Sequence, residues 1–435
     1  MRAKFLILLT SILLSLILMT ACSVKEEDTM EKSSNKHNDS TSNYSQEDHT
    51  QMLTESLLFV KKELPKRHKN MFTKITKEEF NDAIEKLIEN IENLNDTQVY
   101  TELNKIIASI GDAHTNINYW DGYSYPLKFW IFEDEVYIIN ADTSLEEMMY
   151  SQVLKIDGVD IDEVVKQLTS LISYENESWL LARLPRYLQW PVFMYGLGII
   201  ENEQEAVFTV LKDDGTVQDF TVTPLEFDQE ANYVDQIKNN PIIGEFEKNY
   251  YYDLIPDSKA IYFQYNVCAN MDDLIFKDFN KEMFNTIEEN AIDKIVVDLR
   301  SNTGGNSEIL NPFTKSLKSY IKKNSDVKVY TLVGRNTFSS GMFAIYRIKE
   351  AVPQAISVGE PTGGALDCFG EVKIMELPNT QIPISYSTKY FEFTKSFKYK
   401  NDGVGTFLPD ITIRPTIEDF KSGRDVVLNY VLEAN

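Results

Sequence analysis

The sequence predicts an α/β protein in which a mixed-sheet core is layered with helices, preceded by a helical region and a β-rich insert. Apolar residues recur at helical spacing through residues 50–110. Between residues 124 and 226, short apolar segments bounded by turn residues are typical of strands. From residue 260 onward, strand and helix patterns alternate, as in α/β layers. The chain has 435 residues, 43% of them hydrophobic, enough for one large core or two or three smaller ones.

These changes of pattern divide the chain into five segments. Residues 23–47 contain almost no apolar side chain, so they cannot bury enough surface to offset the entropy lost on ordering. In order, we expect a signal peptide (1–22), a disordered polar tether (23–49), a helical region (50–118), a β-rich domain (119–228) and an α/β core (229–435).

The first 22 residues have the pattern of a secretory signal. Residues 1–4 carry two basic side chains and residues 5–19 are largely apolar, which is short for a membrane span. Met-Thr-Ala-Cys at residues 19–22 resembles a bacterial lipobox. That resemblance implies cleavage before Cys22, lipid attachment to its sulfur and a location on the outer face of the cell membrane. An ordinary signal peptide with an incidental cysteine, or an uncleaved anchor, also fits the pattern.

Charge and cysteine content exclude several classes of partner. The formal net charge is -24 at pH 7, which repels phosphate backbones, so we expect no nucleic-acid partner. The spacing of Cys22, Cys268 and Cys368 matches no zinc site and no disulfide framework, although a Cys268–Cys368 pair stays open. No nucleotide-binding motif is present either, and we expect neither a metal nor a cofactor.

The β-rich domain resembles a degenerate peptide-binding PDZ domain. Strand patterns at residues 126–132, 135–139 and 152–156 lead to an Asp157-Gly158 turn and a helix over residues 161–171. The carboxylate-binding loop of such domains is not evident. Any small β-rich insert fits the pattern equally well.

Three segments carry candidate chemistry. Ser339 lies between a predicted strand and a predicted helix, where free N–H groups and the helix dipole favour an oxyanion. Gly304 and Gly305 follow a buried strand and allow close backbone approach. His114 could accept a proton near neutral pH. The same residues also fit a helix N-cap, a tight turn and a surface histidine, respectively.

The residues and the order of these segments resemble the motifs of the carboxy-terminal processing (tail-specific) and tricorn-core family of serine peptidases. The matching segments are GDAHT (111–115), DLRSNTGGN (298–306), TFSSG (337–341), VGEPTGG (358–364) and NDGVGTFLPDI (401–411). The resemblance spans nearly the whole folded chain. It implies a core of the ββα, crotonase/ClpP-like type.

Carried over position by position, the resemblance assigns roles to individual residues. It implies that Ser339 is the nucleophile, and that Ser340 and either Gly304 or Gly305 supply the oxyanion N–H groups. The processing-protease branch uses a lysine where this chain reads Gly-Gly-Ala at residues 363–365. The tricorn-like branch uses a histidine at the position of His114, so we expect His114 to be the general base.

The remaining catalytic group is open. The other histidine of the folded part, His68, has basic neighbours that predict a solvated loop. The acid of the tricorn-like branch aligns with Lys400, which cannot accept a hydrogen bond. Asp402 could replace it, or it could be a turn residue before glycine. Asp112, beside His114, is a further candidate.

The sequence therefore predicts a membrane-anchored, extracytoplasmic serine hydrolase, most simply a peptidase acting on peptides or proteins. Two other functions stay open. One is an inactive surface protein that binds peptides, which the missing lysine and the unsettled third group favour. The other is an esterase that uses the same site.

Overall fold

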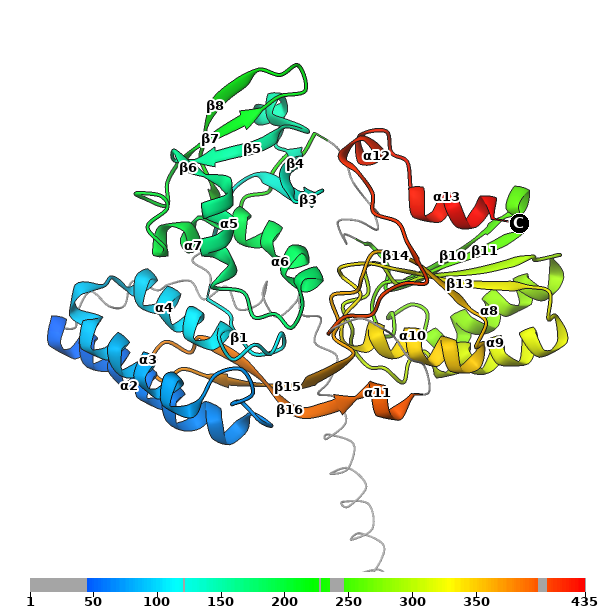
Figure 1. Ribbon diagram of the computed structural model, residues 1–435, viewed down its shortest axis with the longest axis horizontal. Coiled ribbons are helices and arrows are strands. Elements are labelled where there is room, and N and C mark those ends of the chain that lie inside the picture. Colours follow the sequence, from blue (N-terminus) through cyan, green and yellow to red (C-terminus); the bar gives the residue numbers. More distant parts are fainter. Residues whose placement is uncertain (1–44, 120–121, 227, 235–245, 398–404, 435) are drawn as a thin grey trace, which may run out of the picture.

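The computed structural model is a mixed α/β protein, with antiparallel sheets and one mostly parallel sheet flanked by helices (Figure 1). It describes residues 45–119, 122–226, 228–234, 246–397 and 405–434. The predicted signal peptide, Cys22 and most of the predicted tether lie outside these residues. Within the described part of the chain, no helix has the length and apolar character needed to cross a membrane.

Three helices, α2, α3 and α4, form the N-terminal region. Ser45, Thr76 and Asn95 each close a capping box at one of their N-termini. The predicted end of the tether is wrong, because the Ser45 capping box starts the first helix at Gln46. The helices are α2 (Gln46–Arg67), α3 (Lys77–Asn90) and α4 (Asp96–Ala108), with the short 3-10 turn η2 (Ile91–Asn93).

The β-rich domain contains an antiparallel sheet of order β3-β4-β5-β7-β8, with β6 paired to β5. Its strands are β3 (Leu127–Phe132), β4 (Glu135–Ala141), β5 (Gln152–Ile156), β6 (Val159–Asp160), β7 (Ala206–Leu211) and β8 (Val217–Val222). Its helices are η3 (Thr143–Met148), α5 (Ile161–Thr169), α6 (Glu177–Gln189) and α7 (Pro191–Gly196). A separate pair joins β2 (Tyr123–Ser124) to β9 (Leu225–Glu226). The likeness to a PDZ domain stays a prediction.

The second half of the chain contains a six-stranded sheet of order β10-β11-β12-β13-β14-β17, parallel except for β10. All five residues of β12 are buried, as expected for a strand covered on both faces. Its strands are β10 (Tyr250–Ile255), β11 (Ala260–Tyr265), β12 (Lys294–Asp298), β13 (Lys328–Val333), β14 (Ile356–Gly359) and β17 (Ile411–Thr412).

Helices cover both faces of this sheet. Helices α8, α9 and α10 pack on one face and α13 on the other, as Figure 1 shows. Their bounds are α8 (Phe276–Glu289), α9 (Asn311–Lys323), α10 (Ser340–Ala351) and α13 (Val426–Glu433); η4 (Pro256–Ser258), α11 (Phe393–Ser396) and α12 (Ile417–Lys421) are short. This arrangement confirms the predicted alternation of strands and helices.

A long hairpin leaves this core and joins the N-terminal helices. Strands β15 (Asp367–Glu376) and β16 (Pro383–Glu392) form a three-stranded sheet with β1 (Asn116–Ile117). Met375 and Ile384 are buried among the apolar residues of the helical region. The segment predicted as the α/β core (229–435) thus includes a hairpin that reaches the N-terminal region, while Cys368 at its other end packs in the α/β core. The Ser385 hydroxyl of β16 donates to the His114 carbonyl at 3.0 Å.

Candidate active site

Ser339 occupies the turn between β13 and α10 in an unusual backbone conformation. Its φ is 48° and its ψ is -119°, a region that residues other than glycine rarely adopt. Although it holds the N-cap position, its side chain makes no cap hydrogen bond. No hydrogen bond of its hydroxyl is found among the described residues. The turn therefore presents a hydroxyl that is not used to cap the helix.

Hydrogen bonds to the loop after β12 fix this turn. The Thr337 hydroxyl donates to the Leu299 carbonyl at 2.8 Å, and the Phe338 N–H donates to the Asn302 carbonyl at 2.9 Å. Asn302 is fully buried, and its amide donates to the Tyr265 carbonyl at 2.8 Å. The loops after β12 and β13 are thus held together, and Ser339 is fixed next to the glycine pair.

The two glycines have different positions and different hydrogen bonds. The Gly304 N–H donates to the Asn302 side chain at 3.0 Å. A Cβ built on Gly304 would lie 2.8 Å from Ser339 Cβ, so only glycine fits there without displacing the serine. The Gly305 and Ser340 N–H groups donate no hydrogen bond among the described residues, so these two are available to an oxyanion. Of the alternatives in the sequence, Gly305 supplies the free N–H and Gly304 provides the space.

His114 reaches the nucleophile turn through an aromatic stack. Its ring stacks on Phe338, the residue before Ser339, with centroids 4.5 Å apart, and Phe338 stacks on Trp179 at 3.9 Å. His114 is 5% exposed, which excludes the surface-residue interpretation. Neither ring nitrogen has a hydrogen-bond partner, and no hydrogen bond joins it to Ser339. The imidazole therefore lies at the turn with both ring nitrogens unbonded.

Asp112 is a buried carboxylate that collects several hydrogen bonds. Its Oδ1 accepts the His114 backbone N–H at 3.0 Å and lies 3.8 Å from His114 Nδ1. Its Oδ2 accepts the Thr115 hydroxyl at 2.6 Å and pairs with His68 Nε2 at 2.9 Å. Burial alone would raise the pKa of Asp112, but these donors and the nearby His114 lower it to about 2. Asp112 therefore stays ionised at neutral pH.

The prediction that His68 lies in a solvated loop is wrong. Its side chain is fully buried, and its ring packs against Phe369 of β15 with centroids 5.0 Å apart. Lys69, its neighbour in sequence, is exposed. Lys69 thus faces the solvent, while the His68 imidazole points inward to Asp112.

Glu175 is a partly buried acid, with its Oε2 buried, that the sequence did not reveal. Burial and the charge of Asp112 raise its pKa to about 8, and its Oε2 has no hydrogen-bond partner. The next residue, Asn176, caps α6 and donates to the carbonyls of Gly363 and Gly405 at 2.9 and 3.0 Å. The N-cap position of Asn176 was the available sequence signal, but it says nothing about burial.

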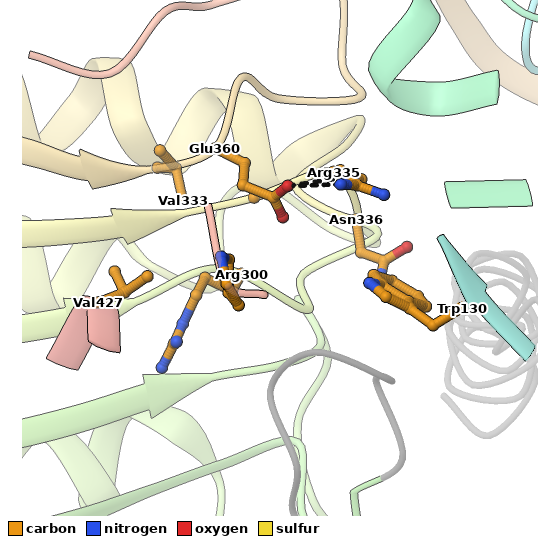
Figure 2. A pocket seen from close by; sticks show the side chains of 9 residues that line it. Trp130, Arg300, Val333, Arg335, Asn336, Glu360 and Val427 are labelled. Atoms are coloured by element: carbon orange, nitrogen blue, oxygen red, sulfur yellow. Dashed lines mark hydrogen bonds and ion pairs between the residues drawn. The ribbon is translucent and has the colours of Figure 1, made fainter. Parts of the chain in front are cut away.

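Arg335 connects the nucleophile turn to the β-rich domain. Its guanidinium pairs with Glu360 at 2.8 Å, donates to the Ile131 carbonyl of β3 at 2.7 Å and lies 5.7 Å from the Trp130 ring. Figure 2 shows the Arg335–Glu360 pair, with Asn336 and Trp130 beside it. The turn that carries Ser339 is thus tied to strand β3.

Several sequence predictions fall outside this geometry. Asp402 and Lys400 lie outside the described residues, so the role of Asp402 stays a prediction. Cys268 and Cys368 are both buried free thiols, so the open disulfide pair is not formed. In the part of the chain that the structure describes, no group of three or more His, Cys, Asp or Glu side chains is arranged to hold a metal ion.

Comparison with known proteins places the fold. No family model and no curated protein sequence matches the chain. Among solved structures, mature CPAF in complex with lactacystin superposes with a TM-score of 0.63 at 13% identity. The match covers 88% of this chain and 98% of that one. The chain has the fold of the carboxy-terminal processing and tricorn-core peptidases.

Two other solved structures are similar over the same share of the chain. The photosystem II D1 C-terminal processing protease matches with a TM-score of 0.41 at 12% identity, covering 88% of this chain and 98% of that one. The tricorn protease matches with a TM-score of 0.38 at 13% identity, covering 88% of this chain and 36% of that one.

Proposed function

We propose that the chain is a serine peptidase in which Ser339 is the nucleophile and His114 the general base. The observation that carries the proposal is the convergence at one turn of three features. The Ser339 hydroxyl makes no capping hydrogen bond to helix α10, and the residue has a positive φ. The Gly305 and Ser340 N–H groups donate no hydrogen bond among the described residues. The His114 ring packs against Phe338. This combination fits acyl transfer better than it fits a binding surface.

In the proposed reaction, Ser339 Oγ attacks a peptide carbonyl while His114 takes its proton. The carbonyl oxygen becomes an oxyanion that accepts hydrogen bonds from the Gly305 and Ser340 N–H groups. The C–N bond then breaks, and His114 returns the proton to the leaving amine. Water, deprotonated by His114, hydrolyses the acyl-enzyme and releases Ser339.

His114 must turn toward Ser339 for this reaction. Such hydrogen bonds are often long in an unliganded enzyme and shorten when substrate binds. Because neither imidazole nitrogen is bonded at rest, the rotation breaks no existing hydrogen bond of the ring. The same observation favours a second candidate, an inactive protein that binds peptides at this site without cleaving them.

Hydrolysis assays separate the candidate functions. A peptidase cleaves an unfolded protein or an extended peptide, and Ser339→Ala or His114→Ala lowers turnover, by up to about 10⁶-fold for the nucleophile. Ser325→Ala, at an exposed serine, is the matched control and keeps full activity. Cleavage of simple esters but not of peptides indicates the esterase. Peptide binding without hydrolysis by the wild type indicates the inactive binding protein.

The proposed location is the outer face of the cell membrane, with the lipid on Cys22. It rests on the lipobox-like sequence and on the polar stretch that follows. Cells grown with labelled palmitate are expected to incorporate it into the wild type and not into Cys22→Ser. Equal labelling of the two proteins would overturn the lipid anchor but leave the proposed catalytic site unaffected.

A further inference from the structure

A buried chain of side chains runs from the end of α2 to the His114 ring. His68 follows the last residue of α2, and Asp112 follows α4. His68 Nε2 lies 2.9 Å from Asp112 Oδ2, while Asp112 Oδ1 faces His114 Nδ1 at 3.8 Å. The side chains of His68, Asp112 and His114 are at most 4% exposed, so water does not compete for these contacts.

The hydrogen bonds define the protonation state of His68. The Asn70 backbone N–H donates to His68 Nδ1 at 3.1 Å, so this nitrogen carries a lone pair and no proton. The imidazole is therefore neutral with its proton on Nε2, which donates to Asp112. A histidine in this form acts as a fixed donor and brings no charge.

The two carboxylate oxygens of Asp112 accept hydrogen bonds from different donors. Oδ2 accepts both the His68 ring and the Thr115 hydroxyl, so its lone pairs are occupied. Oδ1 accepts the His114 backbone N–H at 3.0 Å and faces His114 Nδ1 at 3.8 Å. The carboxylate is thus locked in one orientation, with its open side toward the proposed base.

We propose that Asp112 and His68 form a positioning pair, in which His68 holds the Asp112 carboxylate and Asp112 holds the His114 imidazole with its proton on Nδ1. This inference rests on the proposed function. It goes beyond that function by assigning the missing acid and adding a second histidine behind it. A proton on Nδ1 leaves His114 Nε2 bare, the form needed to accept the Ser339 proton.

The other ionisable groups near Asp112 are compatible with this role. Glu175, whose pKa burial raises to about 8, is mostly neutral at pH 7 and adds little negative charge. Burial and the nearby acids raise the pKa of the Cys368 thiol far above its usual value, so it stays neutral as well. Lys74 is the nearby cation that counters Glu175. Asp112 therefore carries the negative charge that faces His114.

Histidine NMR tests the pair without relying on catalysis. With ¹⁵N-labelled histidine in the full chain, His68 is expected to carry its proton on Nε2 and His114 on Nδ1 at neutral pH. Asp112→Asn is expected to remove the preference for Nδ1 at His114. Signals are assigned with His68→Gln and His114→Gln. A wild-type His114 protonated on Nε2 would overturn the proposal, whether or not the protein hydrolyses peptides.

Kinetics test the same pair through His68, which touches no substrate. His68→Phe keeps the ring packing on Phe369 but loses the donor, and kcat is expected to fall about tenfold to a hundredfold with KM unchanged. His68→Gln supplies an N–H near the position of Nε2 and is expected to restore most of the rate. If both variants match the wild type, or if both lose the same activity, the positioning role is excluded.

The charge of Asp112 can be tested separately from its packing. Asp112→Asn keeps the size of the side chain but removes its charge, so kcat is expected to fall with KM unchanged. An unchanged kcat would contradict the proposal. If the wild type itself is inactive, the proposed function fails and the NMR result alone decides whether the pair exists. If His68→Phe does not fold, His68→Gln and Asp112→Asn carry the test.

Discussion

The backbone of Ser339 is held in a conformation that costs stability. A non-glycine residue at a φ of 48° and a ψ of -119° is disfavoured by about 1–3 kcal/mol. Hydrogen bonds from Thr337 and Phe338 to the neighbouring loop hold the turn in place. In the same turn the Ser339 hydroxyl makes no capping hydrogen bond. The backbone strain and the proposed nucleophile therefore arise from one structural feature, the conformation of this turn.

This strain predicts different thermal midpoints for two inactive variants. Ser339→Gly relieves the unfavourable φ and ψ and is expected to have a higher thermal midpoint than Ser339→Ala, which keeps the Cβ. Differential scanning calorimetry of the two variants measures the difference. A lower midpoint for the glycine variant would show that the turn does not carry this strain.

The raised pKa of Glu175 predicts a pH-dependent stability. Its folded pKa, about 8, lies above the ordinary value of 4.5, so the stability it contributes is present below pH 4.5 and lost as pH rises to about 8. Glu175→Gln cannot ionise. It is therefore expected to gain thermal stability over the wild type between pH 5 and pH 8, with no further gain above pH 8. A difference that is constant over pH 5–9 would contradict the buried, raised pKa.

Local motifs identified some of these residues, and long-range packing determined the others. Ser339, Ser340 and Gly305 lie in short motifs that can be recognised in the sequence from their residues and from the turns that they predict. The surroundings of His68 and Glu175 depend on the hairpin residues Phe369 and Cys368, which are about 300 residues from His68 and about 200 from Glu175. No property of either segment alone reports that contact, so the basic neighbours of His68 gave the wrong prediction.

At the scale of elements, Arg335 couples strand β3 to the nucleophile turn. The Arg335 and Glu360 side chains are 8% and 12% exposed, and the guanidinium also bonds the Ile131 carbonyl. Arg335→Met leaves Glu360 as a nearly buried unpaired charge. We therefore expect the free energy of unfolding of the protein to fall by about 3–5 kcal/mol.

A double variant distinguishes loss of the ion pair from loss of packing. Arg335→Met combined with Glu360→Met removes both charges and is expected to recover a large part of the stability lost by the single variant. Thermal midpoints of the two single variants and the double variant give the comparison. If the two losses simply add, the ion pair does not account for the coupling between β3 and the turn.

The elements themselves were predicted unevenly, for physical reasons. Strands β5, β11, β12 and β13 were evident because buried strands give short, continuous apolar runs. Helix α6 was missed because it contains Pro185, which disfavours a helix in any sequence-based argument. The β15–β16 hairpin was missed because its place in the fold depends on pairing with Asn116 and Ile117, about 270 residues earlier in the chain.

At the scale of the whole molecule, the candidate site is assembled from three regions. His114 comes from the N-terminal helical region, Trp179 from the β-rich domain and Ser339 from the α/β core. Trp179, Phe338 and His114 form one stack across all three. A ligand at this site therefore contacts a surface that exists only when the three regions are packed together.

This assembly predicts that an extended peptide stabilises the entire protein. With Ser339→Ala, which binds without cleaving, a peptide that the wild type hydrolyses is expected to raise the thermal midpoint as its concentration increases. At a hundred times Kd the expected gain is about 2.7 kcal/mol. Calorimetry at several peptide concentrations provides the measurement. A midpoint that does not change at saturating peptide would contradict binding across the three regions.

The central claim is that Ser339 is a nucleophile activated within this fold, and covalent labelling tests it most directly. The full chain is treated with a fluorophosphonate, digested and analysed by mass spectrometry. The account predicts one adduct, on the peptide that contains Ser339, present in the wild type and Ser325→Ala and absent from Ser339→Ala. An adduct of equal yield in Ser339→Ala, or no adduct in the folded wild type, would contradict it.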